Sequence, residues 1–237
     1  TAEIRKDPKR HPLRRELLKV ELLPYQLDGV AFAVGAGRAI LADDMGLGKT
    51  IQGIGVAELL AREVQISKVL IVCPTSLKSQ WRNEIERFSG RTCQLVTGGA
   101  AARALQYGNE CFFTVCNYEQ VLRDILAIER VKWDLIILDE GQRIKNWEAK
   151  TSRIIKALRS PFALVLSGTP LENRLDEFRN LVGYLRRDLV VDANEFSPKK
   201  FRRQVAPAYV RRNQEDVLTE LPELVEVDEW VPMSDRD

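Results

Sequence analysis

Residues that build many common functional sites are scarce in this chain. Among 237 residues there is one histidine, His11, and the four cysteines form no C-x-x-C pair. Because a zinc site needs several Cys and His ligands at close spacing, we expect neither zinc nor a metal cluster. Cys73, Cys111 and Cys116 lie in apolar runs, where a free thiol behaves as a small buried hydrophobe. This usage is typical of a reducing compartment.

Long apolar stretches are also missing. No run approaches the ~20 residues that span a bilayer, and no signal-peptide pattern opens the sequence. We therefore expect a soluble, cytoplasmic protein with no membrane partner, nucleoid-associated in a bacterium or nuclear in a eukaryote.

An excess of one charge is absent as well. The net charge is only +2, so composition alone does not indicate nucleic-acid binding, and motifs must carry any such claim. Residues 1–19 are basic and residues 215–230 are acidic, and we interpret both as solvated flanks; the alternative for the N-terminal flank is a linker from an upstream segment. The length and the 45% hydrophobic content suffice for a full core.

Short apolar runs alternate with helical patterns through the middle of the chain. Nearly continuous apolar runs of this kind are typical of strands buried on both faces of a parallel sheet. The alternation predicts a doubly wound α/β fold. We expect a sheet domain over 20–170, after the flank 1–19, and helices plus a connector over 171–237. The predicted strands are 38–42, 68–73, 92–96, 111–116, 134–139 and 162–167; the predicted helices are 25–37, 50–63, 76–89, 117–129, 146–160 and 171–188.

The stretch RAILADDMGLGKT, residues 38–50, nearly matches a phosphate-binding loop. The strict pattern G-x-x-x-x-G-K-[ST] ends in Gly48, Lys49 and Thr50, but Asp43 stands where its first glycine belongs. A glycine-rich turn at a helix start presents N–H groups to phosphate, while the lysine adds a charge and the threonine hydroxyl can bind Mg²⁺. The alternative is an ordinary strand-to-helix turn. The expected nucleotide-binding residues here are Asp44, Met45, Gly46, Leu47, Gly48, Lys49 and Thr50, with Lys49 also catalytic.

A pair of acidic residues follows the apolar run 135–138. Asp139 and Glu140 come directly after it, so both carboxylates stand at the carboxyl end of a predicted strand. Asp139 is placed to hold Mg²⁺, and Glu140 is placed to orient or deprotonate a water that attacks the γ-phosphate of ATP. Taken alone, the two acids would be read as helix caps.

Six stretches in order resemble the signatures of Swi/Snf-type ATPases, superfamily 2 helicase-like proteins that translocate on double-stranded DNA. The phosphate loop of that family begins with an acid, which accounts for Asp43. Asp44 stands where the family more often has Glu, and Gln142 replaces the histidine of a DEAH-like box; we expect it to retain a hydrogen-bonding role in catalysis. "DEGQRIKNW" looks more like bacterial members. The stretches are LLPYQLDGV, DDMGLGKT, LIVCPTSLKSQW, LDEGQRIKN, LSGTPLEN and YVRRNQEDVLTELP.

The resemblance implies further roles. Gln26 would read the adenine edge, and Ser167, Gly168 and Thr169 would couple the nucleotide state to DNA. Loops after the second, third and fourth strands would contact the DNA backbone without reading its sequence. We expect Trp81 to be a core residue, and Lys78 to face DNA or water. The candidate DNA-contact residues are Pro74, Thr75, Ser76, Thr97, Gly98, Asn117 and Tyr118.

The family's engine has two RecA-like lobes with ATP between them, and this chain resembles the first. We therefore expect ATP and Mg²⁺ as cofactors, double-stranded DNA and a second RecA-like lobe as partners, and a remodelling or translocating activity only with that lobe present. The fragment alone should be inactive or very weak. The alternatives are an ATP-sensing scaffold without turnover and a P-loop small-molecule kinase, which would need neither Gln26 nor the SGTP stretch.

Overall fold

The computed structural model describes residues 1–140, 158–168, 181–189 and 203–220. Within these ranges the chain forms a seven-stranded sheet in the order β3-β4-β2-β5-β6-β1-β7, and every pairing is parallel. All six predicted strands are present. The seventh, from the end of the chain, was not predicted. The strands are β1 Arg38–Leu41, β2 Val69–Cys73, β3 Cys93–Leu95, β4 Phe113–Asn117, β5 Leu135–Asp139, β6 Phe162–Leu166 and β7 Tyr209–Val210.

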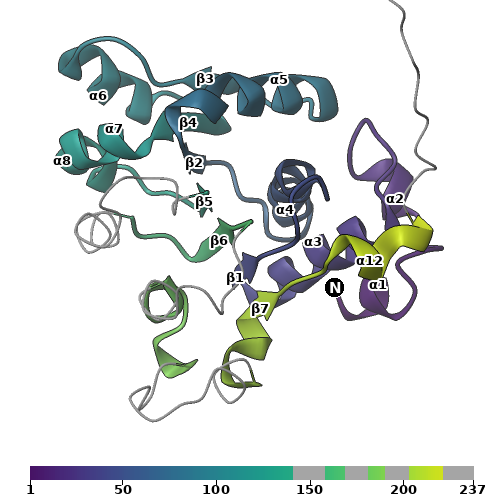
Figure 1. The fold of residues 1–237 in the computed structure, drawn as a ribbon. Helices are drawn as coiled ribbons and strands as arrows, with labels where there is room; N and C mark the ends of the chain where they lie inside the picture. The colour runs from purple at the N-terminus through teal and green to yellow at the C-terminus, as the bar shows by residue number, and fades with distance from the viewer. Residues whose placement is uncertain (141–157, 169–180, 190–202, 221–237) are drawn as a thin grey trace, which may run out of the picture.

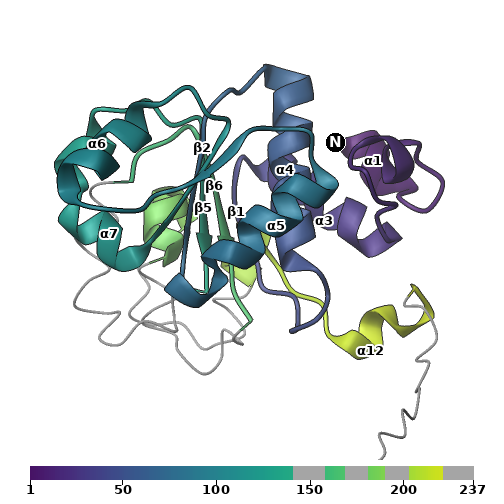
Figure 2. The same ribbon diagram turned by 90° about the horizontal axis from the view of Figure 1, so that it is seen from above.

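Helices cover both faces of this sheet, as the two ribbon views show (Figures 1 and 2). One face carries α1 Ala2–Lys6, α2 Leu13–Glu16, α3 Pro24–Ala36, α4 Lys49–Val64 and α5 Lys78–Phe88. The other carries α6 Ala100–Gly108, α7 Tyr118–Arg123 and α8 Ile125–Glu129. The doubly wound prediction is therefore confirmed. Shorter elements are α12 Gln214–Val217 and the 3-10 helices Thr75–Leu77, Arg187–Leu189, Ala206–Ala208 and Leu218–Glu220; residues 181–185 and 203–205 are also helical.

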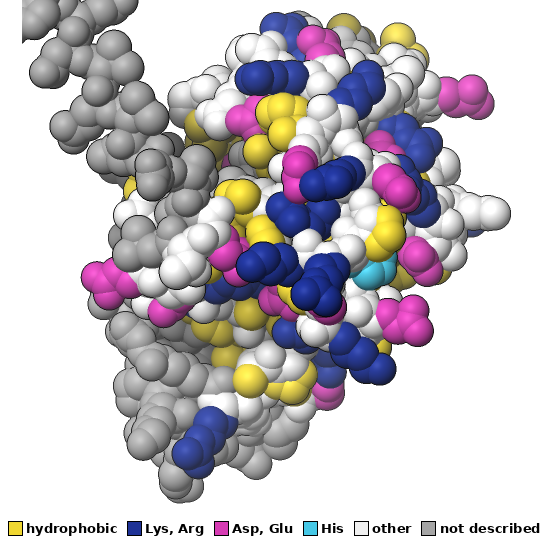
Figure 3. Space-filling view, turned by 90° about the vertical axis from the view of Figure 1, so that its right-hand side faces the viewer, with side chains coloured by type: hydrophobic (Ala, Val, Ile, Leu, Met, Phe, Trp, Pro, Cys, Tyr) yellow, Lys and Arg dark blue, Asp and Glu magenta, His cyan; other side chains and the backbone are white. Residues whose placement is uncertain are grey.

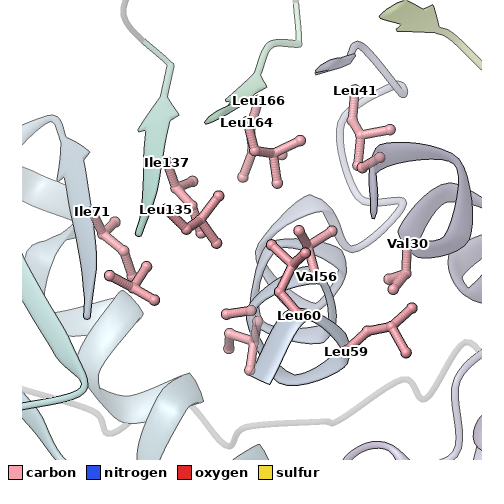
Figure 4. Close-up of a cluster of buried hydrophobic side chains, with 14 of the residues drawn as sticks. Val30, Leu41, Val56, Leu59, Leu60, Ile71, Leu135, Ile137, Leu164 and Leu166 are labelled. Carbon is pink, nitrogen blue, oxygen red and sulfur yellow. The ribbon is translucent and has the colours of Figure 1, made fainter. Parts of the chain in front are cut away.

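Two hydrophobic clusters form because successive strand residues point to opposite faces. In β5, Leu135 and Ile137 join the cluster under α4, whereas Ile136 and Leu138 join the cluster under α7 and α8. Figure 4 shows the first cluster, where side chains from four strands point toward Val56 and Leu60 of α4. Continuous apolar strands are thus explained by burial on both sides.

The predicted helix 117–129 is in fact two helices. It breaks at Asp124, whose backbone leaves the helical region at φ −109° and ψ 20°. The Asp124 carboxylate accepts hydrogen bonds from Arg103 and Tyr107 of α6, a helix that was not predicted. A tertiary ion pair has overridden the local helical pattern.

The basic flank 1–19 is partly structural. Ile4, Leu17 and Leu18 are buried in the first cluster, and Arg5 pairs with Asp28 of α3 at 2.9 Å. Figure 3 shows Lys and Arg side chains interspersed with Asp and Glu on this side of the molecule. The reading of this flank as merely solvated was therefore incomplete. Among the described residues, no helix is long and apolar enough to cross a membrane.

The parallel strands direct their carboxyl ends to one edge of the sheet. In open α/β sheets this edge binds ligands. It holds the turn after β1, the two acids at the end of β5, and the loops after β2, β3, β4 and β6. Gln142, Thr169 and most of the predicted helix 146–160 lie outside the described residues.

Candidate nucleotide site and neighbouring loops

The phosphate loop, residues 42–48, has the backbone that its glycines predict. Gly46 and Gly48 adopt positive φ of 85° and 77°, a region that other residues enter only with strain. Gly48 is also the N-cap of α4, and a β-carbon there would lie 2.5 Å from the Gln26 Nε2 atom. The turn therefore closes tightly onto α3 and leads its N–H groups into the start of a helix.

Lys49, the first residue of α4, turns back over this loop. Its Nζ donates to the carbonyl oxygens of Asp43 at 2.8 Å and Asp44 at 3.2 Å. Burial lowers the pKa of Lys49, while the nearby acids, Glu140 first among them, act in the opposite direction. A partly desolvated ammonium held by neutral carbonyls is well suited to bind an anionic phosphate.

The two acids at the carboxyl end of β5, Asp139 and the next residue Glu140, have different environments; we call them the β5 acids. Asp139 is 5% exposed, and its Oδ2 accepts a 2.8 Å hydrogen bond from the Trp81 indole nitrogen. Its backbone oxygen accepts from the Tyr118 hydroxyl at 2.9 Å. Glu140 has a positive φ of 47° and donates its backbone N–H to Leu166. Such strain in a residue other than glycine is concentrated at functional sites, so we count it in favour of a catalytic role.

A cavity of about 340 Å³ unites the loop and the acids. It gathers Met45, Gly46, Gly48, Lys49 and Thr50 with Asp139 and Glu140, as the sequence predicted. At its margin, a β-carbon on Gly168 would lie 3.6 Å from Glu140 Oε1 and 3.8 Å from Lys49 Nζ. Residues that line the cavity and were not predicted to do so are Ile51, Leu77, Gln80, Trp81 and Glu84.

Gln26 of α3 and Leu47 of the phosphate loop are not among the residues that line that cavity. The Gln26 amide accepts from the Leu23 N–H at 2.9 Å and donates to the Leu47 oxygen at 3.3 Å, and the Tyr25 hydroxyl donates to the same oxygen. Gln26 thus caps α3 and braces the phosphate loop. Adenine recognition by Gln26 stays a prediction.

The carboxylates of Asp43 and Asp44 are both engaged by other side chains of the protein. Asp43 is fully buried and accepts hydrogen bonds from Gln52 of α4 and from Arg212, while Asp44 pairs with Arg211 at 3.3 Å. These partners lie up to 169 residues away in the sequence, where no local pattern connects them to the loop.

Ser167 continues β6 between the phosphate loop and the acids. Its N–H donates to the Leu41 oxygen at 3.0 Å, and the residue is buried. Ser167 and Gly168 therefore lie where a coupling element was predicted, but the coupling itself stays a prediction.

The residues at and after the carboxyl ends of β2, β3 and β4 form a joined surface, residues 74–76, 97–98 and 117–118, which we call the three-loop surface. Thr75, Ser76, Thr97 and Gly98 are exposed. Asn117 donates to the Thr75 hydroxyl at 3.0 Å, so two of the loops are tied directly.

Lys78 lies beneath this surface, and our expectation that it faces DNA or water is wrong. The side chain is 8% exposed and donates to the Val96 oxygen at 2.6 Å and to Gln120 at 3.2 Å. Gln120 in turn accepts from the Asn117 N–H and donates to Val96. One amide and one ammonium thereby join the loops after β3 and β4.

Tyr118 also requires correction. It is 2% exposed, and its hydroxyl donates to Asp139, so it braces the acidic site from within the core instead of presenting a side chain to DNA. In the neighbouring loop, the Thr97 N–H is taken by Gln106 at 2.8 Å, which leaves the exposed Thr97 hydroxyl for a phosphate contact. Trp81 is 1% exposed, which confirms that it is a core residue.

The geometry of this site agrees with what the chain resembles. A model of the SNF2-related domain matches residues 25–237. The chain belongs to this family. It is 30% identical over 240 residues to the ISWI chromatin-remodeling complex ATPase ISW1 of Saccharomyces cerevisiae, covering 90% of this chain and 21% of that protein. It is 36% identical over 182 residues to the DNA repair and recombination protein RAD54B of Mus musculus, covering 69% and 20%.

Solved SNF2-family structures share the fold. The Sulfolobus solfataricus SWI2/SNF2 ATPase core in complex with dsDNA superposes with a TM-score of 0.77 at 27% identity, covering 87% of this chain and 48% of that one. The RecA-like lobe that the sequence predicts is thus confirmed. The chain spans about a fifth of the length of these two curated relatives.

Proposed function

We propose that this SNF2-family chain is the ATP-binding first lobe of a motor that translocates on double-stranded DNA and remodels nucleoprotein. Lys49 and the N–H groups of the phosphate loop bind the phosphates of ATP. Thr50 and Asp139 would hold Mg²⁺, which would supply positive charge to neutralise the transferred phosphoryl group. Glu140 orients and deprotonates the attacking water, and Gln142 assists through hydrogen bonding.

The observation that carries this proposal is the single cavity shared by the phosphate loop and both β5 acids. An isolated glycine turn or an isolated acid pair has ordinary structural explanations. A lysine, a threonine hydroxyl and two carboxylates around one cavity match the requirements of phosphoryl transfer. A scaffold that only senses ATP would not need Glu140 in a strained conformation beside Lys49.

DNA binding is assigned to the three-loop surface. Its exposed groups are hydroxyls, amides and backbone, which suit phosphate oxygens, and it lacks paired Arg or Asn side chains that read base edges. We therefore propose sequence-independent, salt-sensitive contacts with the duplex backbone. Ser167, Gly168 and Thr169 couple the nucleotide state to this surface, and a second RecA-like lobe is the partner that completes the ATP site.

Phosphate release by the full-length protein, with and without duplex DNA, tests this function. We expect DNA-stimulated turnover, which Lys49→Ala abolishes through lost ATP binding. Glu140→Gln should keep ATP binding and reduce turnover by about 10²-fold or more, because the carboxylate acts only in the transition state.

The chain of residues 1–237 alone serves as the matched comparison. An arginine finger contributes about 10³–10⁵ in rate, and in this family's arrangement it comes from the second lobe, so we expect no DNA-stimulated turnover from this chain. Unchanged turnover in Glu140→Gln would remove Glu140 from the mechanism. ATP binding by the full-length protein without any turnover would favour the scaffold alternative.

A further inference from the structure

The segment that follows β7 lies against the phosphate loop, although the two are about 170 residues apart in sequence. We call residues 209–214 the return segment. Its backbone extends the sheet past the end of β1: Ala42 donates its N–H to Val210 at 2.8 Å, and Asp44 donates to Arg212 at 3.0 Å. Gln214 adds a side-chain hydrogen bond to the Met45 oxygen at 3.3 Å. One side of the loop is therefore formed by the return segment.

Arg212 is the centre of this contact. Its guanidinium donates to Asp43 Oδ2 at 3.1 Å, to Asp28 Oδ2 at 3.1 Å and to the Tyr25 oxygen at 2.7 Å. Its side chain is 12% exposed. A single residue thus fastens the return segment to the phosphate loop and to α3.

Asp43 receives this contact at the position where the strict phosphate-loop pattern has glycine. Its carboxylate is fully buried and accepts from the Gln52 side chain at 3.0 Å, the Arg212 N–H at 3.0 Å and the Arg212 guanidinium. Its backbone oxygen accepts from Lys49 Nζ at 2.8 Å. The carboxylate therefore faces the return segment while the carbonyl of the same residue faces the phosphate-binding lysine.

We propose that Arg212 is a positioning residue for nucleotide binding, which acts through Asp43 to hold the phosphate loop and Lys49 in their binding geometry. The inference rests on the proposed ATP-binding function. The inference also assigns a role to Asp43. Where the strict pattern has a glycine, Asp43 supplies the carboxylate that accepts hydrogen bonds from Arg212 of the return segment. Because coupling between two sites is reciprocal, ATP at the loop must in turn stabilise the return segment.

A buried ion pair could also serve stability alone, since its desolvation cost offsets much of its attraction. The two roles differ in what ATP does. If Arg212 only stabilises the fold, its removal lowers the melting temperature and leaves the ATP affinity of the folded protein unchanged. If it positions the loop, ATP affinity falls even where the protein is fully folded.

The test measures ATP affinity by calorimetry and thermal stability in the full-length protein. Arg212→Ala should weaken ATP binding by about tenfold, within the usual range of coupling between sites. Arg212→Lys should recover only part of the loss, because one ammonium cannot reach Asp43, Asp28 and the Tyr25 carbonyl together. Asp43→Asn keeps the side-chain shape, and it tests the same link if Arg212→Ala does not fold. The double variant Asp43→Asn with Arg212→Lys should lose less ATP-binding free energy than the sum of the losses in the two single variants.

The matched control is Arg91→Ala. Arg91 pairs with Glu58 at 3.1 Å and ties a loop to the far half of α4, away from the phosphate loop. We expect it to lower stability without a change in ATP affinity.

Hydrogen exchange measures protection of backbone amides by ATP, which a purely structural role of Arg212 would leave unchanged. ATP should slow exchange of the Arg212 amide and of the Ala42 and Asp44 amides, and Arg212→Ala should remove that protection. Unchanged ATP affinity in folded Arg212→Ala and Asp43→Asn would overturn the inference. Lys49→Ala separates the positioning role of Arg212 from the proposed ATP site. If Lys49→Ala leaves ATP affinity unchanged, the ATP site itself is contradicted.

Discussion

Two halves of the same sheet edge are built on different principles. The phosphate loop is held by charged groups and by partners distant in sequence: Arg212, Asp43 and the close approach of α3 to α4. The three-loop surface is held by amides from neighbouring helices and by two largely buried cations, Lys78 and Arg103; Arg103 donates to the Gly98 oxygen at 2.8 Å while it pairs with Asp124. Both halves fix loops at strand ends with a buried ion pair, but only in the first does a residue of the loop itself, Asp43, supply the carboxylate of that pair.

The difference follows from the ligands that we propose for each half. A triphosphate concentrates charge in one place, so the groups that bind it must be fixed closely, and rigid support limits the cost of ordering them on binding. A duplex backbone offers phosphates spaced along a surface, and exposed hydroxyls on loops of fixed relative position suffice. The first half should therefore tolerate substitution less well than the second.

Glycine-to-alanine substitutions at a packed position beside the phosphate loop and at an open position of α6 provide the strongest contrast. A β-carbon added at Gly29 of α3 would collide with Gln52 Oε1 and lie 3.1 Å from Arg212 Nη1. Since Gln52 is fully buried and bonded to Asp43, it has no room to move aside. Gly29→Ala should therefore destabilise the protein by about 1–3 kcal/mol, although alanine normally favours a helix.

Gly108, at the C-terminal end of α6, is the comparison position; it lies at the opposite edge of the sheet, next to Asn109, whose oxygen accepts from Lys68 ahead of β2. It is exposed, and a β-carbon there meets no atom within 4 Å. Gly108→Ala should leave stability unchanged or raise it by about 0.5–1 kcal/mol. Urea unfolding of both variants makes the comparison. Equal effects would mean that the α3–α4 contact is as adaptable as the free end of α6.

The sequence was sufficient for the parts of the site that depend on local spacing. Six strands, the phosphate loop and the β5 acids were predictable, because apolar runs, glycines and acids at strand ends are short-range signals. The cavity then brought together Lys49, Thr50, Asp139 and Glu140 as expected.

The residues that support the site were not predictable. Arg212 reaches Asp43 across 169 residues, and Trp81 reaches Asp139 across 58, so no window of sequence contains both partners. Lys78 was misread because a lysine on an amphipathic helix is usually solvated, whereas here the Val96 carbonyl and Gln120 satisfy a buried one.

Lys78→Met tests the support of the three-loop surface. Burial lowers the pKa of Lys78, so its charged form is disfavoured in the fold, and an apolar side chain of similar length removes that cost. Val96 keeps its hydrogen bond from Gln120. Stability should therefore change little or rise, while DNA affinity falls modestly because the segments after β3 and β4 lose one of the groups that join them.

The measurement is fluorescence anisotropy with duplex DNA in the full-length protein over a range of salt, alongside ATP affinity. Arg87→Met, at the exposed far end of the same helix, is the control and should change neither. A fall in ATP affinity of Lys78→Met as large as the fall in DNA affinity would show that the two halves are not independent.

The smallest expected effect concerns the Cys116 thiol in β4, under the three-loop surface. Burial raises the pKa of Cys116 from 9.0 to about 12; Lys78 and Tyr107 act against this shift and Asp124 adds to it. A raised pKa stabilises the fold fully below pH 9, and this contribution is lost as pH rises from 9 toward 12, because the unfolded chain releases the proton first. Cys116→Ala has no thiol at this position, so it cannot show this loss of stability.

At pH 7 the variant should be less stable than the parent because it leaves a small cavity. By pH 10 the difference in unfolding free energy should shrink by about 1 kcal/mol, close to the value of one pKa unit. Urea titrations of both proteins between pH 7.5 and 10 measure this difference, and a constant gap would mean that water reaches the thiol beneath these loops.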